Sequence, residues 1–129
     1  MMYREPSDSP WGLVVRCDTL CPGVYSVSTA GHGGIMAQID AARQLLSLEA
    51  QQVGFQAGGY LNFEEDCDAS VALRELMDSG IIAPRTDNYF RPGESCIDRS
   101  LQRWNPAYWR ARQKRLSVQA AKATKERER

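Results

Sequence analysis

The sequence contains few of the features that identify an activity directly. Its 129 residues include one histidine, His32, and only three lysines, all at position 114 or later. No apolar run approaches the roughly eighteen residues that cross a bilayer, and the N-terminal residues lack the apolar core of a secretion signal. We therefore expect a cytoplasmic protein that makes no membrane contact.

Complete catalytic and cofactor motifs are also missing. There is no Gly-x-Ser-x-Gly elbow for a serine nucleophile. The glycine-rich stretch lacks the lysine and the following Ser or Thr of a phosphate-binding loop. We therefore expect no cofactor, and a binding protein rather than an enzyme.

Cysteine content does not indicate a disulfide framework. Without an export signal, we expect Cys17, Cys21, Cys67 and Cys96 to be reduced thiols, each a small buried hydrophobe. Cys17 and Cys21 have a spacing found in zinc sites, and His32 or Cys67 could complete the ligands. A single such pair, with no second one, is weak support, so we predict no metal site.

What the chain does have is a strong charge polarity. Residues 99–129 carry ten Lys or Arg against two Glu, a net charge of +8, and residues 1–98 carry −8. We therefore divide the chain into an acidic domain, 1–98, and a basic, aromatic-containing C-terminal helix or tail, 99–129. This polarity favours docking of the tail on the body, self-association into a homodimer, or contact between the tail and nucleic acid.

Local patterns predict an α+β fold. Alternating or β-branched stretches bounded by glycine and proline indicate strands, and apolar residues at helical spacing indicate helices. The expected strands are residues 11–17, 24–29, 35–37, 58–63 and 81–83, with a turn at 18–23 and an irregular loop at 85–95. The expected helices are residues 38–53, 66–79 and 107–125, the last entered through an Asn105 N-cap and Pro106. We expect a small, mostly antiparallel sheet of three to five strands, with two helices on one face and the basic C-terminal helix.

The candidate site centres on His32. Gly31, Gly33 and Gly34 surround it, and glycine allows positive φ and close approach of the backbone to a partner. The acidic segment Glu64, Glu65, Asp66 and Cys67 follows another strand, so both segments are expected at strand ends that converge.

Three interpretations of this cluster remain open. His32 can pin the glycine loop while the acidic residues cap the following helix, or the cluster, with Gly31, Gly33, Gly34 and Glu65, can bind a ligand. In the third, a small hydrolase or transferase uses His32 as base, Glu64 or Asp66 to orient it, and Cys67 as nucleophile.

A second candidate surface lies in the C-terminal segment, where aromatic and basic residues alternate. Its members are Arg103, Trp104, Tyr108, Trp109, Arg110 and Arg112. These residue types are typical of protein interfaces, and they also stack on bases and neutralise phosphates. The remaining reading is that the tryptophans pack on the body and the arginines are solvated.

The order of motifs resembles a known family. Pro10-Trp11-Gly12, Pro22-Gly23-Val24, Ser28-Thr29-Ala30-Gly31-His32-Gly33-Gly34 and Glu64-Glu65-Asp66-Cys67 are similar to a family of uncharacterised bacterial domains found in phage and plasmid proteins. The resemblance covers residues 10–80 and leaves out the basic tail. It implies one coherent small fold, a mobile-element setting, and a shared cluster of His32 with the acidic segment.

These observations lead to one function hypothesis with two alternatives. We expect a small phage or plasmid accessory protein that binds a host or phage protein, with inhibition of a host defence or regulatory complex as its role. The alternatives are the small hydrolase or transferase built on His32, and a nucleic-acid-binding protein that uses residues 99–129.

Overall fold

The protein has an α+β fold, as the sequence predicts. The computed structural model describes residues 3–84 and 93–128. Its main sheet has five antiparallel strands in the order β3-β4-β5-β7-β6, preceded by the small hairpin β1-β2. The strands are β1 Asp8–Ser9, β2 Gly12–Leu13, β3 Arg16–Cys21, β4 Val24–Ser28, β5 Gly33–Gln38, β6 Phe55–Ala57 and β7 Tyr60–Glu64. The helices are α1 Ile39–Leu45, α2 Leu48–Val53, α3 Ala69–Asp78, α4 Glu94–Trp104 and α5 Pro106–Arg127.

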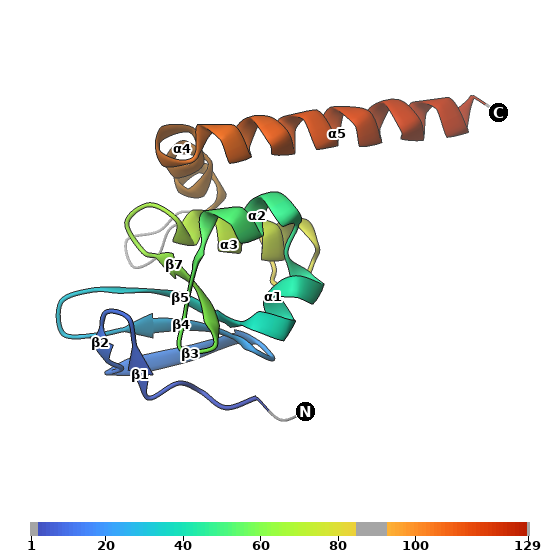
Figure 1. Ribbon diagram of the computed structural model, residues 1–129. Helices are drawn as coiled ribbons and strands as arrows, with labels where there is room; N and C mark the ends of the chain where they lie inside the picture. Colours follow the sequence, from blue (N-terminus) through green and yellow to red (C-terminus); the bar gives the residue numbers. More distant parts are fainter. Residues whose placement is uncertain (1–2, 85–92, 129) are drawn as a thin grey trace.

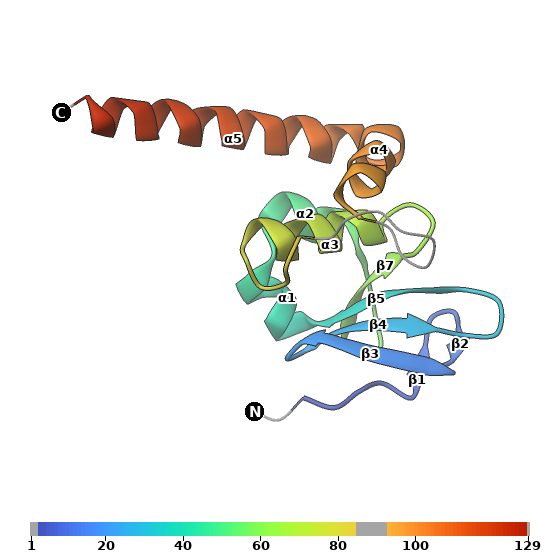
Figure 2. The same cartoon turned by 180° about the vertical axis from the view of Figure 1, so that it is seen from behind.

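Both faces of the sheet are covered, which explains why the central strand β5 is buried almost throughout. On one face, α1, α2 and α3 pack on side chains such as Ile35 and Phe63 to form the main core (Figure 1). The N-terminal segment runs along the other face of the sheet (Figure 2). There Tyr3 and Trp11 pack against a smaller cluster of Tyr25, Val27 and Met36. A strand that is buried on both sides shows no alternation of apolar and polar residues. The sequence therefore does not predict which side chains of β5 face which side of the sheet.

The first predicted strand, residues 11–17, is wrong in its limits. The chain forms the hairpin β1-β2, leaves it after Leu13, and begins β3 at Arg16. Strand β3 then continues to Cys21, so the predicted turn at 18–23 shrinks to Pro22-Gly23, where Gly23 has a φ of +87°. Strand β3 pairs antiparallel with β4, with Arg16 opposite Ser28 and Cys21 opposite Val24.

The single helix predicted over residues 38–53 is two helices, α1 and α2. The break falls at Ser47, whose side chain accepts a hydrogen bond from the Ala50 N–H at 3.2 Å and starts α2. The Ser47 N–H donates to Glu75 Oε1 at 2.6 Å. Because Leu46 and Ala50 are both buried, the apolar spacing continues across the break and conceals it.

The hairpin β6-β7 and the segment after α3 also differ from expectation. Gly58 and Gly59 both have positive φ and form a two-residue turn, and the preceding strand β6 was not predicted. The strand predicted at 81–83 is wrong. There the N–H groups of Ile81 and Ile82 both bond to the Leu76 carbonyl, closing the end of α3.

The C-terminal part is more helical than expected. Helix α5 starts at Asn105-Pro106 as predicted, whereas α4, which begins at Glu94, was not predicted. Residues 85–92 of the predicted loop lie outside the described residues. Ile97 and Leu101 of α4 join the main core, and α5 then extends well past the body (Figures 1 and 2). In the described part of the chain, no helix is long and apolar enough to cross a membrane.

Candidate functional site

The loop that carries His32 is held rigidly at its base. It joins β4 to β5, and the Thr29 N–H donates to the His32 carbonyl at 2.7 Å. The Thr29 hydroxyl donates to the same carbonyl at 2.7 Å and accepts from the His32 N–H at 3.1 Å. The backbone of His32 is therefore fixed, while its half-exposed side chain points out of the loop.

The glycines around His32 do not supply positive φ, contrary to expectation. Gly33 and Gly34 are extended residues of β5, and Gly31 also lies outside the left-handed region. Two of them instead allow close approach. A Cβ on Gly34 would collide with the Phe63 carbonyl and the Trp11 ring, and one on Gly33 would meet Val27 and Glu65.

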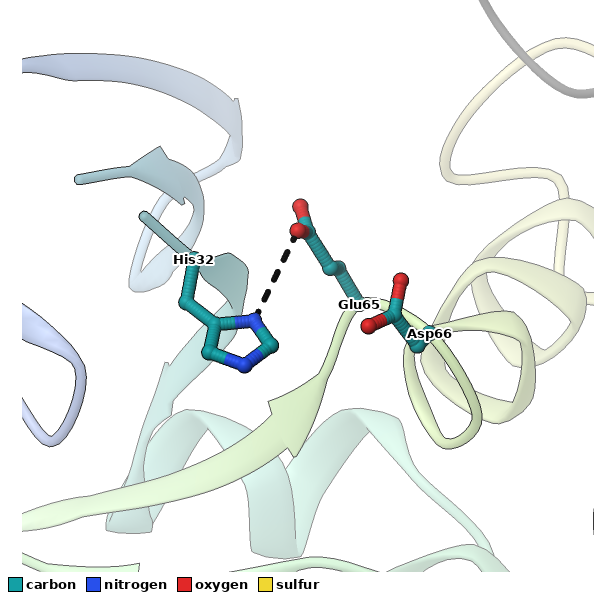
Figure 3. Close-up of side chains that lie close together, drawn as sticks. All are labelled: His32, Glu65 and Asp66. Atoms are coloured by element: carbon teal, nitrogen blue, oxygen red, sulfur yellow. Dashed lines mark ion pairs between the residues drawn. The ribbon is translucent and has the colours of Figure 1, made fainter. Parts of the chain in front are cut away.

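The acidic segment begins at the end of β7, directly beside this loop. Strand pairing places Glu64 opposite Gly34, and the Glu65 N–H donates to the Gly33 carbonyl at 3.1 Å. His32 Nδ1 lies 3.8 Å from Glu65 Oε1 (Figure 3). His32 Nε2 lies 4.0 Å from Glu64 Oε1. These distances bring charges together but exceed those of direct hydrogen bonds.

Asp66 completes a group of three potential metal ligands. One ligand atom each from His32, Glu65 and Asp66 lies within 4.8 Å of the others (Figure 3). Among the described residues, this is the group whose spacing could hold an ion, and it contains no cysteine. The alternative zinc site on Cys17 and Cys21 therefore finds no support in the geometry.

Cys67 turns toward the carboxylates of its own segment. Its Sγ lies 4.0 Å from Glu64 Oε2. Burial, followed by the charges of Asp68 and Glu64, raises the pKa of the Cys67 thiol. A raised pKa lowers the thiolate fraction at neutral pH, which is the wrong direction for an activated nucleophile.

The second predicted surface is divided between internal contacts and solvent. Tyr108 is buried, and its hydroxyl donates to Glu75 Oε2 at 2.5 Å. Arg112 binds Asp78 through two hydrogen bonds, of 2.7 and 3.0 Å. Trp109 packs on the main core. These three predicted binding residues therefore fasten α5 to the body.

The sequence did not predict the carboxylates of α3 that bind Tyr108 and Arg112. Glu75 and Asp78 lie on α3, and Glu75 is only 6% exposed. Next to them, the buried Arg74 binds Glu94 at 3.0 Å and Asp98 at 2.6 Å. The one available signal was a charged pair, Arg74-Glu75, placed between apolar residues of a predicted helix.

The rest of the predicted surface is exposed. Trp104 is 53% exposed, and the Arg103 guanidinium lies 4.9 Å from its ring centroid. Arg110 lies on the solvent side of α5. Residues 116–128 are exposed without exception.

Comparison with known proteins assigns the chain to a family. The family model described as a domain of unknown function (DUF7007) matches residues 4–129, so the chain belongs to that family. The match runs through the basic C-terminal segment, which the resemblance over residues 10–80 had left out. No curated protein and no solved structure matches the chain.

Proposed function

We propose that this family member is a non-enzymatic interaction protein that presents α5 to a protein partner. The observation that carries the proposal is the contrast between the two parts of this helix. Its first turns are fastened to the body, whereas residues 116–128 are exposed all round. A helix that leaves its own core in this way has surface available for another molecule (Figure 1).

The anchored part fixes the direction of the helix. Tyr108, Arg112 and Arg115 all bind carboxylates of α3, and Arg115 lies 3.4 Å from Glu75 Oε2. Isolated helices of this length are marginal in water. Continuity with the anchored turns therefore supports the exposed part, which is rich in good helix formers such as Ala, Lys and Gln.

Four of the five exposed cations of α5 share one helix face, and Arg127 lies on the opposite side. Arg110, Lys114, Lys122 and Lys125 are exposed, and none forms an ion pair with another described residue. Their spacing of three, four or eight residues places them along one helix face, with Val118 between them. This cationic face suits an acidic protein surface and would steer association with it.

Trp104 adds an aromatic anchor close to the base of that helix. It ends α4, one residue before the Asn105 N-cap of α5, and most of its ring is in solvent. Tryptophan and arginine dominate the energetics of protein interfaces. The stacked pair Arg103 and Trp104 therefore supports a protein partner.

We extend the proposal to the setting of the protein on the strength of its motif order. The similarity to phage and plasmid domains supports a mobile-element accessory protein acting in the cytoplasm. The partner would then be a host protein of a defence or regulatory complex, inhibited by occupation of an acidic surface.

Nucleic acid is a second candidate partner, favoured by the same cationic face. Four cations along one helix can neutralise phosphates. Against it stands the net charge of −8 on residues 1–98, which repels a polyanion that approaches the body. We therefore rank protein first.

Site-specific photo-cross-linking in cells that produce this protein tests the proposal. A photoreactive residue replaces Val118 on the cationic face, and a matched control replaces Ala120 on the opposite side of the same exposed turns. We expect an adduct from position 118 and none from position 120. The adduct should contain this chain and a second, different polypeptide. Removing the four cations by substitution with alanine should abolish it.

The nature of the adduct decides between the candidates. A nuclease-sensitive adduct would replace the first candidate with the second, and an adduct of two copies of this chain would assign α5 to self-association. The proposal fails if position 118 gives no adduct, or if positions 118 and 120 give the same one.

A further inference from the structure

We propose that His32, Glu65 and Asp66 form a binding site for a divalent transition-metal ion. The site lies where the β4–β5 loop meets the segment between β7 and α3 (Figure 3). It does not depend on the function proposed for α5, which lies in another part of the molecule.

The distances between the ligand atoms suit a shared ion. Metal bonds from imidazole nitrogen and carboxylate oxygen are each about 2.1 Å, so two ligands on opposite sides of one ion are about 4.2 Å apart. His32 Nδ1 and Glu65 Oε1 are 3.8 Å apart, and the group with Asp66 lies within 4.8 Å. The upper limit of these separations exceeds the distance across an ion by about half an ångström. Small rotations of the exposed side chains can remove this difference.

Within residues 3–84 and 93–128, the carboxylates of this region have no Arg or Lys partner. Among the described residues, no Arg or Lys forms an ion pair with Glu64, Glu65 or Asp66. The carboxylates of the α3–α5 junction are different, because Arg74, Arg112 and Arg115 neutralise them. The three adjacent carboxylates lie beside His32 alone among these side chains. They therefore leave a net negative charge that a bound cation would balance.

The backbone already holds two of the three ligand residues, His32 and Glu65, in place. The Thr29 hydroxyl fixes His32, and the Glu65 N–H binds the Gly33 carbonyl across the two segments. Binding an ion therefore requires ordering of side chains only, which limits the entropy lost.

The donor set indicates the class of ion. Imidazole favours zinc, cobalt, nickel and copper, whereas calcium and magnesium prefer sites made of oxygen alone. Three protein ligands at an exposed position leave coordination sites for water. We therefore expect modest affinity and dependence on the imidazole.

Titration of the full chain with Co²⁺ tests the site. Calorimetry measures the affinity, and NMR follows the imidazole protons, which are unambiguous because His32 is the only histidine. We expect Co²⁺ to shift or broaden these signals at one equivalent. The visible spectrum should lack thiolate charge transfer, and Cys67→Ser should leave binding unchanged.

Conservative variants separate a built site from general attraction to negative charge. His32→Gln, Glu65→Gln and Asp66→Asn should each weaken Co²⁺ binding at least about tenfold. Glu49→Gln, an equal charge change at an exposed position of α2, should not. Ca²⁺ should bind more weakly than Co²⁺ and should not respond to His32→Gln.

Two results would overturn the inference. One is a lack of any Co²⁺ effect on the imidazole signals up to millimolar ion. The other is equal affinity in the wild type and His32→Gln, which would show attraction to the carboxylates alone.

Discussion

The hydroxyl of Tyr108 on α5 donates a hydrogen bond to the buried carboxylate of Glu75 on α3. The other oxygen of this carboxylate accepts from the Ser47 N–H, at the break between α1 and α2. One acidic side chain thus connects three helices that are far apart in the sequence. The basic C-terminal segment is fastened to the acidic body through this connection.

Tyr108→Phe should destabilise the protein by about 1–3 kcal/mol, because it removes a donor from a buried carboxylate. Urea unfolding measures the change. Tyr3→Phe is a matched control, since the Tyr3 hydroxyl also donates to a carboxylate, Asp40, but at a partly exposed site. We expect the control to cost less than about 1 kcal/mol. Equal costs for the two variants would contradict the importance assigned to burial.

Gly34→Ala should destabilise the fold by about 3 kcal/mol or more, because the new methyl group meets the Phe63 carbonyl and the Trp11 ring. Gly31→Ala is the matched control in the same motif. A Cβ there finds no atom within 4 Å. Thermal unfolding should show a clear loss for position 34 and almost none for position 31; similar effects would exclude close approach as the reason for Gly34.

Acid should weaken the attachment of α5 through Asp78. Burial opposes ionisation of this carboxyl, but the hydrogen bonds and charge of Arg112, assisted by Arg74, hold its pKa below the ordinary value of 3.8. A group with a lowered pKa contributes stability above the unfolded pKa and loses it as the pH falls through the folded one.

Urea unfolding of the wild type and Asp78→Asn at several pH values checks this dependence. The variant should be the less stable protein near neutral pH, and the difference should shrink as the pH falls below about 4. A difference that stays constant down to pH 2 would show that the ion pair with Arg112 is not its source.

Cysteine alkylation at pH 8 tests the catalytic alternative. Burial, with help from Glu5, raises the pKa of Cys17 to about 11, and the pKa of Cys67 is also raised. Both thiols should therefore react with iodoacetamide more slowly in the folded protein than in urea-unfolded chains, as followed by mass spectrometry. A Cys67 that reacts faster when folded would restore it as a candidate nucleophile.

The α+β class and several elements could be predicted because their signals are local. Alternation predicted the strand at residues 24–29, which the structure forms over Val24–Ser28, and the Asn105-Pro106 start predicted α5. Two of the features missed depend on contacts distant in sequence. The break at Ser47 is stabilised by Glu75, and α4 is held by the ion pairs of its acidic residues with Arg74.

The candidate site was predictable in part for the same reason. Two strand ends with chemically active residues suggested that His32 lies near Glu64, Glu65 and Asp66, and the distances agree with that proximity. The direction of Cys67 and the burial of Tyr108 could not be read, because periodicity does not say which element covers a side chain. The need for glycine at position 34 was hidden for a similar reason, because it comes from Trp11, which lies in the turn between β1 and β2.

The dependence of α3 on α5 also governs when the chain can fold during synthesis. Glu75 leaves the ribosome well before Tyr108 and Arg115, and Ile97 and Leu101, which close the same core, also come later. Until the C-terminal helices emerge, the core under the first helices is not fully covered. The Glu75 carboxylate also lacks its donors Tyr108 and Arg115. Native structure is thus delayed until α4 and α5 have emerged, and until then the ribosome-bound chain is exposed to chaperones and proteases.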